Sequence, residues 1–287
     1  MTDISSIYIT ETPRDAMQGW SKHIPTQVKA DYINKLLKCG FDYIDAGSFV
    51  SPKVIPQLAD TSKVFSLLQN DSAKTKLMAI IGNIRGGKEA IQIENINTIG
   101  YPFSISEIFL KQNLHTNTEN AIKTMLELQE MAFRSNKSIR IYISMAFGNP
   151  YGELWNDEIV LQSLDVLSKA GFIDIVFSDT TNEATPEKIT RLCNNTIQTF
   201  PNLQLGLHLH TRHNDTNEKL EAAVNAGIFR FESAVGGYGG CPMTGSDLIS
   251  NLNTADLLHY LNSKGIPTGI DEIALNSAVE MAAKVFE

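Results

Sequence analysis

The feature of this sequence that most constrains its fold is an eightfold alternation between short apolar segments and longer amphipathic segments. Strands that alternate with helices form parallel sheets. Eight such units in 287 residues favour a closed (β/α)8 barrel, the TIM barrel, over an open doubly wound sheet. No Gly-x-Gly-x-x-Gly pattern follows the first strand, which weakens a nucleotide-binding alternative. The expected strands are Ser6–Thr12, Asp42–Phe49, Lys76–Gly82, Thr98–Ser104, Ile139–Ala146, Asp174–Ser178, Leu203–His210 and Phe229–Ala234.

The segments between the strands place apolar side chains at helical spacing. Residue types typical of helix N-caps precede three of them: Thr116, Asn156 and Thr185. Glycines that suit the left-handed position after a helix follow three of them: Gly40, Gly171 and Gly227. We expect helices at Thr26–Lys38, Thr118–Phe133, Asp157–Ala170, Pro186–Phe200 and Asp215–Ala226, and two more after the last strand, at Leu248–Ser263 and Ile270–Phe286. All of them are expected to belong to one domain spanning residues 1–287.

The net charge of −8 leaves no basic field that would attract nucleic acid or an anionic membrane surface. No apolar run approaches the roughly 20 residues that a membrane-spanning helix needs. The three cysteines, Cys39, Cys193 and Cys241, are widely spaced and form no Cys-x-x-Cys pair. This usage is typical of a reducing compartment, so we expect a cytoplasmic protein.

Polar and ionisable residues gather where the expected strands end. In a barrel of this type the carboxyl ends of all eight strands meet at one mouth, where catalytic groups lie. We therefore expect one site there. Its members come from the ends of five strands: Arg14 and Asp15, Asp45, Asp179, His208 and His210, and the run Gly236–Cys241.

The His208-Leu209-His210 motif is the sharpest local signal for a metal. Residues i and i+2 of a strand point to the same side, so both imidazoles would face the mouth. Two imidazoles with an anionic oxygen from Asp15 suit a divalent cation. The alternative is a pair of structural histidines that are hydrogen-bonded within the strand. Downstream, we expect Asp215 to cap a helix and His213 to lie on the surface.

Arg14 and Cys241 are candidates for residues that act directly on a substrate. A guanidinium can stabilise negative charge on a thioester oxygen, or alternatively form a salt bridge that closes the barrel floor. Cys241 lies in the run Gly236-Gly237-Tyr238-Gly239-Gly240-Cys241-Pro242, which suits a phosphate cradle or a mobile lid. A thiol there would shuttle a proton, or would simply be an accessible cysteine.

These motifs together resemble the 3-hydroxy-3-methylglutaryl-CoA lyases, a family within the metal-dependent lyases and synthases built on a (β/α)8 barrel. The resemblance covers roughly Tyr8 to Val285. Its motifs follow in the family's order: Pro13-Arg14-Asp15-Ala16-Met17-Gln18, Ser48-Phe49-Val50-Ser51-Pro52-Lys53, Ser178-Asp179-Thr180, His208-Leu209-His210, Gly239-Gly240-Cys241-Pro242 and Ser250-Asn251-Leu252.

The resemblance implies that Asp15, His208, His210 and Asn251 bind a divalent metal, most often Mg²⁺ or Mn²⁺. It implies roles in catalysis for Arg14 and Asp179, and a mobile loop that carries Cys241 over the substrate. It also implies an acyl-CoA substrate, cleavage to acetyl-CoA and acetoacetate, a place in leucine degradation and ketone-body metabolism, and a homodimer.

Four departures from the family pattern bear on the substrate. Ala16 replaces a glycine, and Asp45 replaces a glutamate on the second strand. Thr10 stands where the family has a glutamate, and strand alternation turns the neighbouring Glu11 to the opposite face. The loop after Cys241 is longer by one residue.

The mechanism that fits is a retro-Claisen cleavage. Asp179, with Asp45, is expected to accept the proton of the substrate's 3-hydroxyl, and Arg14 to stabilise the enolate. Cys241 is expected to protonate the carbanion, with His208 as the alternative. Candidate partners of the CoA phosphates are Lys22, Lys53 and Lys111, although each is better explained as an ordinary surface lysine.

Two rival functions remain open at this point. A related lyase, an aldolase or a Claisen synthase of the same barrel group would share the metal site. A catalytically silent relative that binds CoA is the non-enzyme alternative. Metal-dependent turnover separates the second rival from an enzyme.

Overall fold

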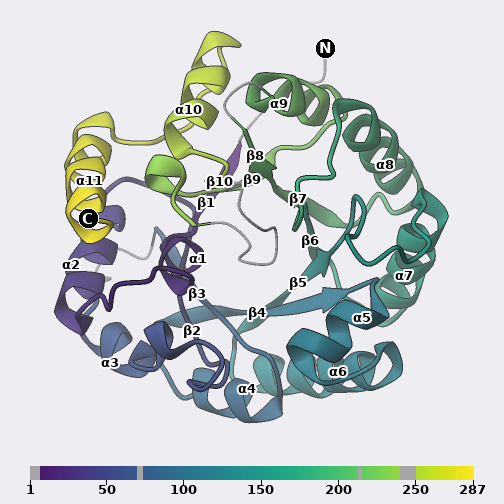
Figure 1. Cartoon of the computed structure of the whole chain (residues 1–287), viewed down its shortest axis with the longest axis horizontal. Coiled ribbons are helices and arrows are strands. Elements are labelled where there is room, and N and C mark those ends of the chain that lie inside the picture. The colour runs from purple at the N-terminus through teal and green to yellow at the C-terminus, as the bar shows by residue number, and fades with distance from the viewer. Residues whose placement is uncertain (1–6, 70–73, 213–214, 240–249) are drawn as a thin grey trace.

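The computed structural model describes residues 7–69, 74–212, 215–239 and 250–287. Eight parallel strands form a closed barrel with helices around it (Figure 1). The barrel closes because β1 pairs with both β2 and β9, which confirms the (β/α)8 barrel over the open sheet. The barrel strands are β1 (Tyr8–Glu11), β2 (Tyr43–Ser48), β3 (Lys76–Ile80), β4 (Ile96–Ser104), β5 (Ser138–Ser144), β6 (Asp174–Ser178), β7 (Gln204–His208) and β9 (Arg230–Ser233).

Helices surround the barrel: most cover its outside, α1 lies at its mouth, and α11 lies beside α2 (Figure 1). They are α1 (Pro13–Gln18), α2 (Thr26–Leu36), α3 (Thr61–Ser66), α4 (Ile84–Ala90), α5 (Glu107–Phe109), α6 (Thr118–Arg134), α7 (Asp157–Lys169), α8 (Pro186–Thr199), α9 (Thr216–Asn225), α10 (Thr254–Ser263) and α11 (Glu272–Val285). Short 3₁₀ or π turns are η1 (Pro56–Leu58), η2 (Leu110–Leu114) and η3 (Val235–Gly237). Within the described ranges, no helix has the length and apolar character needed to cross a membrane.

Local signals set most helix ends. The side chains of Asn156 and Thr185 cap α7 and α8, as predicted. The prediction for Thr116 is wrong, because the extended residue that follows it, Asn117, accepts the hydrogen bond from the helix. Asp215 is the N-cap residue of α9, yet its carboxylate accepts from the backbone of Arg212 and caps no helix N–H. The three predicted left-handed glycines have φ of +89°, +86° and +86°: Gly40, Gly171 and Gly227.

Several predicted strand ends at the mouth are wrong by one or two residues, and three of the wrong boundaries lie next to the candidate site. β1 ends at Glu11, because Pro13 starts α1 and carries Arg14 and Asp15 on a helix instead of a strand end. The seventh barrel strand ends at His208, and His210–Thr211 forms a separate strand, β8. The helix expected from Leu248 begins at Thr254, because Ser250–Asn251 forms β10 and pairs antiparallel with β8.

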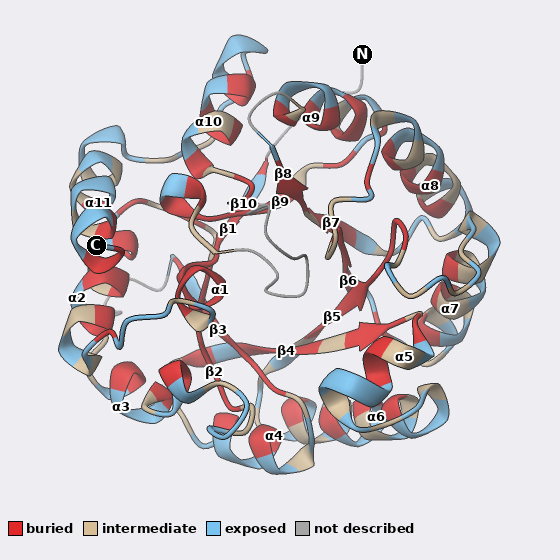
Figure 2. Ribbon diagram, in the orientation of Figure 1, coloured by how far each residue is buried: buried red, intermediate tan, exposed pale blue. Residues whose placement is uncertain are grey.

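The core lies between the barrel and the inner faces of the helices, where the buried residues gather (Figure 2). Buried polar side chains also reach into the barrel itself. Arg140 is 2% exposed and donates to Asp174, Thr10 and Glu232. The barrel interior therefore carries a charged network beneath the mouth.

Candidate active site

A pocket of about 350 Å³ lies at the mouth of the barrel. One side carries the polar groups, which include Arg14, Asp15, His208 and His210. The remaining lining is mostly apolar and comes from the β2–α3 loop, from strand ends and from the α5–η2 segment. Its members include Val50, Val54, Ile55, Ile80, Pro102, Phe109 and Leu114. A polar centre beside an apolar wall suits a ligand with one charged and one apolar end.

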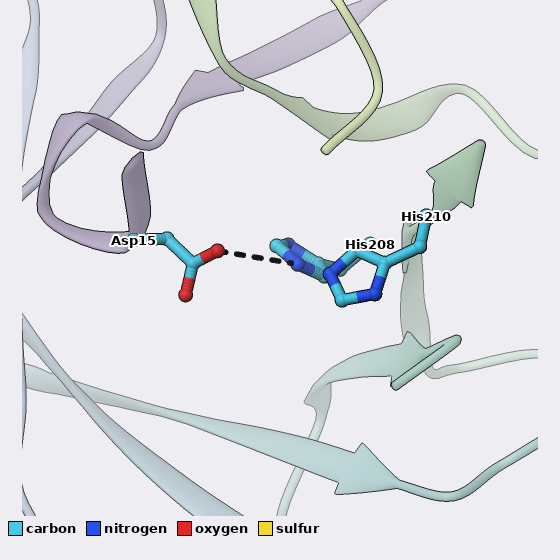
Figure 3. Close-up of side chains that lie close together, drawn as sticks. All are labelled: Asp15, His208 and His210. Carbon is cyan, nitrogen blue, oxygen red and sulfur yellow. Dashed lines mark ion pairs between the residues drawn. The ribbon is translucent and has the colours of Figure 1, made fainter. Parts of the chain in front are cut away.

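Asp15, His208 and His210 form a cluster at the pocket (Figure 3). Each offers one ligand atom, and these atoms all lie within 4.8 Å of one another. Asp15 comes from α1, whereas the two histidines flank the break between β7 and β8. Both histidines line the pocket, so the prediction that both face the mouth is confirmed despite the strand break, and their rings are 5.3 Å apart between centroids.

Asn251 completes this arrangement from β10. Its side-chain nitrogen donates to Asp15 Oδ2 at 2.8 Å and to the Tyr238 carbonyl at 2.9 Å. Its Oδ1 is buried and has no hydrogen-bond partner within the described part of the chain. A buried amide oxygen without a partner is unfavourable unless a ligand completes it. Carboxylate and amide oxygens with two imidazoles are a donor set that fits a divalent cation.

Gly239 packs directly behind this donor set. A Cβ at this position would lie 2.7 Å from Ala16 Cα, 2.8 Å from the Asp15 carbonyl oxygen and 3.0 Å from Asn251 Nδ2. Its φ of +84° is also one that residues with a side chain rarely adopt. Part of the glycine-rich run therefore serves close packing against two candidate ligands.

Arg14 links the cluster to the second strand. Its Nε and Nη2 donate to Asp45 Oδ2 at 2.9 Å and 2.6 Å, and its Nη1 donates to Asp15 Oδ1 at 2.9 Å and Gln18 Oε1 at 2.8 Å. The salt bridge considered for Arg14 exists, but it lies at the mouth and not at the barrel floor. Asp45 is completely buried and orients the guanidinium from behind.

At neutral pH Asp15 is ionised and His210 is neutral, the states in which each can bind a cation. Burial opposes ionisation of Asp15, but Arg14 and the two histidines hold its pKa at about 2. Burial lowers the pKa of His210 to about 4, and the neighbouring His208 adds to this shift. Burial acts in the same direction on His208, but its hydrogen bond to Glu232 and the charge of Asp15 raise its pKa above the ordinary value.

Glu232 on β9 is a functional candidate that the sequence reasoning missed. Its Oε2 lies 3.0 Å from His208 Nδ1, and its Oε1 accepts from Arg140 at 3.0 Å and from the Tyr142 hydroxyl at 2.9 Å. A carboxylate on the distal ring nitrogen fixes the tautomer and orientation of a metal-binding histidine. The sequence signal was an acidic residue in the middle of the last expected strand, Phe229–Ala234.

Asp179 does not line the pocket, although Ser178 and Thr180 on either side of it do. The carboxylate is 1% exposed, and its Oδ1 accepts from the backbone of Glu183 and Ala184. Burial raises its pKa to about 6, against the effect of Lys219. Asp179 can therefore reach a substrate only through a neighbouring group.

The other expected residues fall into three groups. Thr10 faces the barrel interior and Glu11 the opposite side, as alternation predicts: Arg140 donates to Thr10, whereas Val235 and Thr254 donate to Glu11. Cys241 and His213 lie outside the described residues. Lys22, Lys53 and Lys111 are exposed, as surface lysines are, and Lys22 also donates to the carbonyl of Glu287.

Comparison with known proteins shows that this chain is similar to CoA lyases. The family profile described as HMGL-like matches residues 6–281. A hydroxymethylglutaryl-CoA lyase of Bacillus subtilis is 30% identical, over 93% of this chain and 89% of its own. An (R)-citramalyl-CoA lyase of Chloroflexus aurantiacus is 29% identical, over 93% of this chain and 86% of its own.

Solved structures agree with the sequence comparisons. The structure of an HMG-CoA lyase from Acinetobacter baumannii in complex with coenzyme A and 3-methylmalate has a TM-score of 0.91 and 28% sequence identity. The match covers 100% of this chain and 93% of that one.

Proposed function

This chain belongs to the HMGL-like family, and on that premise we propose that it is a carbon–carbon lyase that cleaves 3-hydroxy-3-methylglutaryl-CoA to acetyl-CoA and acetoacetate. The observation that carries the proposal is the cluster of Asp15, His208 and His210 beside Arg14 at the barrel mouth. Hydroxymethylglutaryl-CoA lyases that are about 30% identical over most of the chain support this substrate.

The reaction is a retro-Claisen cleavage. The 3-hydroxyl loses its proton, the bond between C2 and C3 breaks, and C3 becomes the ketone of acetoacetate. The electron pair of the broken bond passes to C2, which forms the enolate of acetyl-CoA. Protonation of C2 then completes acetyl-CoA.

We assign the binding of a divalent cation, Mg²⁺ or Mn²⁺, to Asp15, His208, His210 and Asn251. Two observations support this assignment. The ligand atoms of Asp15, His208 and His210 lie within 4.8 Å of one another, and Asn251 Oδ1 has no hydrogen-bond partner among the described residues. When bound, such a cation neutralises negative charge on substrate oxygens and lowers the pKa of a hydroxyl that it contacts.

The chain's own residues provide the remaining steps. Arg14, which Asp45 holds in orientation, stabilises the enolate oxygen of the thioester, a role worth about 3 kcal/mol per donor. Asp179 and Asp45 are the candidate acceptors of the hydroxyl proton, since burial raises the pKa of each to about 6. Because neither lines the pocket, the proton can reach either only through a neighbouring group, which for Asp179 is the pocket-lining Thr180 that follows it. We assign protonation of C2 to Cys241, with His208 as the alternative.

Further parts of the proposal rest on the sequence patterns and on family resemblance. We propose that residues 1–287 form one catalytic domain, that the protein is a homodimer and that it acts in the cytoplasm. Acetoacetate is a ketone body, so the proposed reaction belongs to ketone-body metabolism and to leucine degradation.

A second candidate is the cleavage of citramalyl-CoA, or another reaction of this lyase, aldolase and synthase group. It is favoured by the 29% identity to an (R)-citramalyl-CoA lyase over 93% of this chain. Citramalyl-CoA and 3-hydroxy-3-methylglutaryl-CoA both carry a hydroxyl and a methyl group on C3. The same metal centre would therefore hold citramalyl-CoA.

The test is acetoacetate formation from 3-hydroxy-3-methylglutaryl-CoA, with Mg²⁺ or Mn²⁺ and again with EDTA. We expect turnover that EDTA abolishes and that His208→Ala reduces at least 100-fold, a typical loss when catalytic charge stabilisation is removed. No product from metal-loaded protein would overturn this substrate. A panel of citramalyl-CoA, other 3-hydroxyacyl-CoA thioesters and 4-hydroxy-2-oxo acids would then identify the alternative.

A further inference from the structure

Lys219 is a buried lysine that the proposed mechanism does not use. It lies on α9, is 2% exposed and does not line the pocket. A buried ammonium group is unfavourable unless it is paired and hydrogen-bonded. Four oxygens surround its Nζ: Asn182 Oδ1 at 2.6 Å, the His210 carbonyl at 2.9 Å, Asp215 Oδ2 at 3.3 Å and Asp179 Oδ2 at 3.5 Å. We call these five residues the Lys219 cluster.

The Lys219 cluster connects three segments that build the site. Asp179 and Asn182 belong to the loop after β6, His210 begins β8, and Asp215 precedes α9. The backbone of Asp179 also donates to the His208 carbonyl at 2.9 Å. The ammonium group of Lys219 therefore joins the loop after β6 to the backbone of His210. Asp179, another member of the cluster, contacts the backbone of His208, a second candidate metal ligand.

The backbone of Asn182 gives an independent sign that this loop is held in place. Its φ is +59°, in the left-handed region, which asparagine tolerates better than most residues but which is still unfavourable. The side chain of Asn182 accepts the shortest of the four contacts of Lys219. Lys219 thus offsets the strain of the turn that follows Asp179.

We propose that Lys219 is a positioning residue for the metal centre. It holds the carbonyl of His210 and the carboxylate of Asp179 at fixed places, and through them it aims the His210 imidazole at Asp15 and His208. Groups that orient a metal ligand from behind typically change metal affinity 10–100-fold when they are removed. The proposal rests on the metal site assigned under the proposed function.

The test compares Lys219→Met with Lys29→Met. Lys29 is a matched control, because it is 1% exposed, lies on α2, pairs with Asp60 Oδ1 at 2.7 Å and donates to the carbonyl of Gln57. Both substitutions remove a buried ammonium group that bridges a carboxylate and a backbone carbonyl. Both are therefore expected to lower the melting temperature.

Only Lys219→Met is expected to weaken the binding of Mn²⁺. We expect its Kd, measured by electron paramagnetic resonance or calorimetry without substrate, to rise about 10-fold or more. The Kd of Lys29→Met should stay within about twofold of the unmodified protein. In the lyase assay, excess Mn²⁺ should raise the kcat of Lys219→Met and leave that of Lys29→Met unchanged.

A second pair of variants keeps the test decisive if Lys219→Met does not fold. In Lys219→Met with Asp179→Asn, the buried carboxylate is neutralised together with the ammonium group, so that only the more exposed Asp215 loses a charged partner. Asp179→Asn alone is the reference. The double variant should still bind Mn²⁺ about 10-fold more weakly than its reference.

Unchanged Mn²⁺ affinity in the Lys219 variants would overturn the positioning role. Because the titration needs no substrate, that result is distinct from a failure of the lyase assignment. Loss of Mn²⁺ binding in the unmodified protein would instead overturn the metal site itself.

Discussion

At the scale of single residues, the proposed metal centre and Arg14 depend on groups that do not line the pocket. Glu232 holds the distal nitrogen of His208, Gly239 leaves room for Asp15 and Asn251, and Asp45 fixes Arg14. Each of these residues is in direct contact with the group that it positions. A small displacement of that group weakens metal binding or catalysis.

Glu232→Gln is expected to raise the Kd for Mn²⁺ about 10–100-fold. The neutral amide does not provide the charged acceptor that orients His208, and it also leaves Arg140 with less compensation. Isothermal titration calorimetry measures the change. Glu11→Gln is the control, because it alters a buried carboxylate that is not bonded to the cluster, and equal Kd values for both variants would contradict the role of Glu232.

Gly239→Ala is expected to weaken Mn²⁺ binding at least tenfold, as loss of ligand support does. Its methyl group would meet the backbone of Asp15 and Ala16, which cannot yield without moving a ligand. Gly265→Ala is a matched control with φ of +69° and no atom within 4 Å of the added Cβ. Both variants share a backbone strain of roughly 1–2 kcal/mol, so a similar Kd in both would show that the close packing at Gly239 is unimportant.

At the scale of elements, Glu11 ties β1 to the segments that flank the mouth. Its carboxylate accepts from the Val235 backbone in η3 and from the Thr254 hydroxyl at the start of α10. Burial raises the pKa of Glu11 to about 8, and its two hydrogen bonds oppose this shift. When protonated, Glu11 can donate to Thr254, whose hydroxyl also lies 2.9 Å from Ser233 Oγ.

The proton on Glu11 predicts a fall in stability with rising pH. The ordinary pKa of 4.5 in the unfolded chain lies below the value of about 8 in the fold, so the folded protein keeps a proton that the unfolded chain loses. The stabilisation is complete below pH 4.5 and disappears as the pH rises through 8. Urea unfolding with EDTA between pH 5 and pH 9 should show a decline that is clearly smaller in Glu11→Gln. Parallel curves for the two proteins would rule out this source of pH dependence.

At the scale of the whole molecule, the proposed metal ligands come from opposite ends of the chain. Asp15 and Asn251 are hydrogen-bonded although 236 residues separate them, and the histidines come from between. A cation that binds only the folded chain stabilises it, by about 2.7 kcal/mol at 100 times its Kd. EDTA should therefore lower the melting temperature, and His208→Ala should remove the difference.

The stabilisation by Mn²⁺ should shrink as the pH falls. The raised pKa of His208 means that a cation must displace a proton from its ring, and this competition grows in acid. Thermal unfolding with and without Mn²⁺ between pH 5.5 and pH 8 measures the effect. A melting-temperature shift that is constant over this range would argue against His208 as a ligand.

Local patterns in the sequence determined the barrel, most helix ends and the orientation of the two histidines, because periodicity, caps and strand alternation act over a few residues. They did not determine the strand boundaries at the mouth. β8 exists because Asn251 pairs with His210 across the fold, and Asn251 entered the predicted metal site only through family resemblance.

The tertiary structure alone decided which buried charges meet. Glu232 contacts His208 from a neighbouring strand, 24 residues away in sequence. Lys219 pairs with Asp179 from a helix, 40 residues away in sequence, and Asp179 does not line the pocket. Such pairs form between side chains that are distant in sequence. The interaction energy of each pair depends on both charged groups being buried together, which we call shared burial. No local pattern in the chain encodes shared burial, so only the closed barrel brings these charges together.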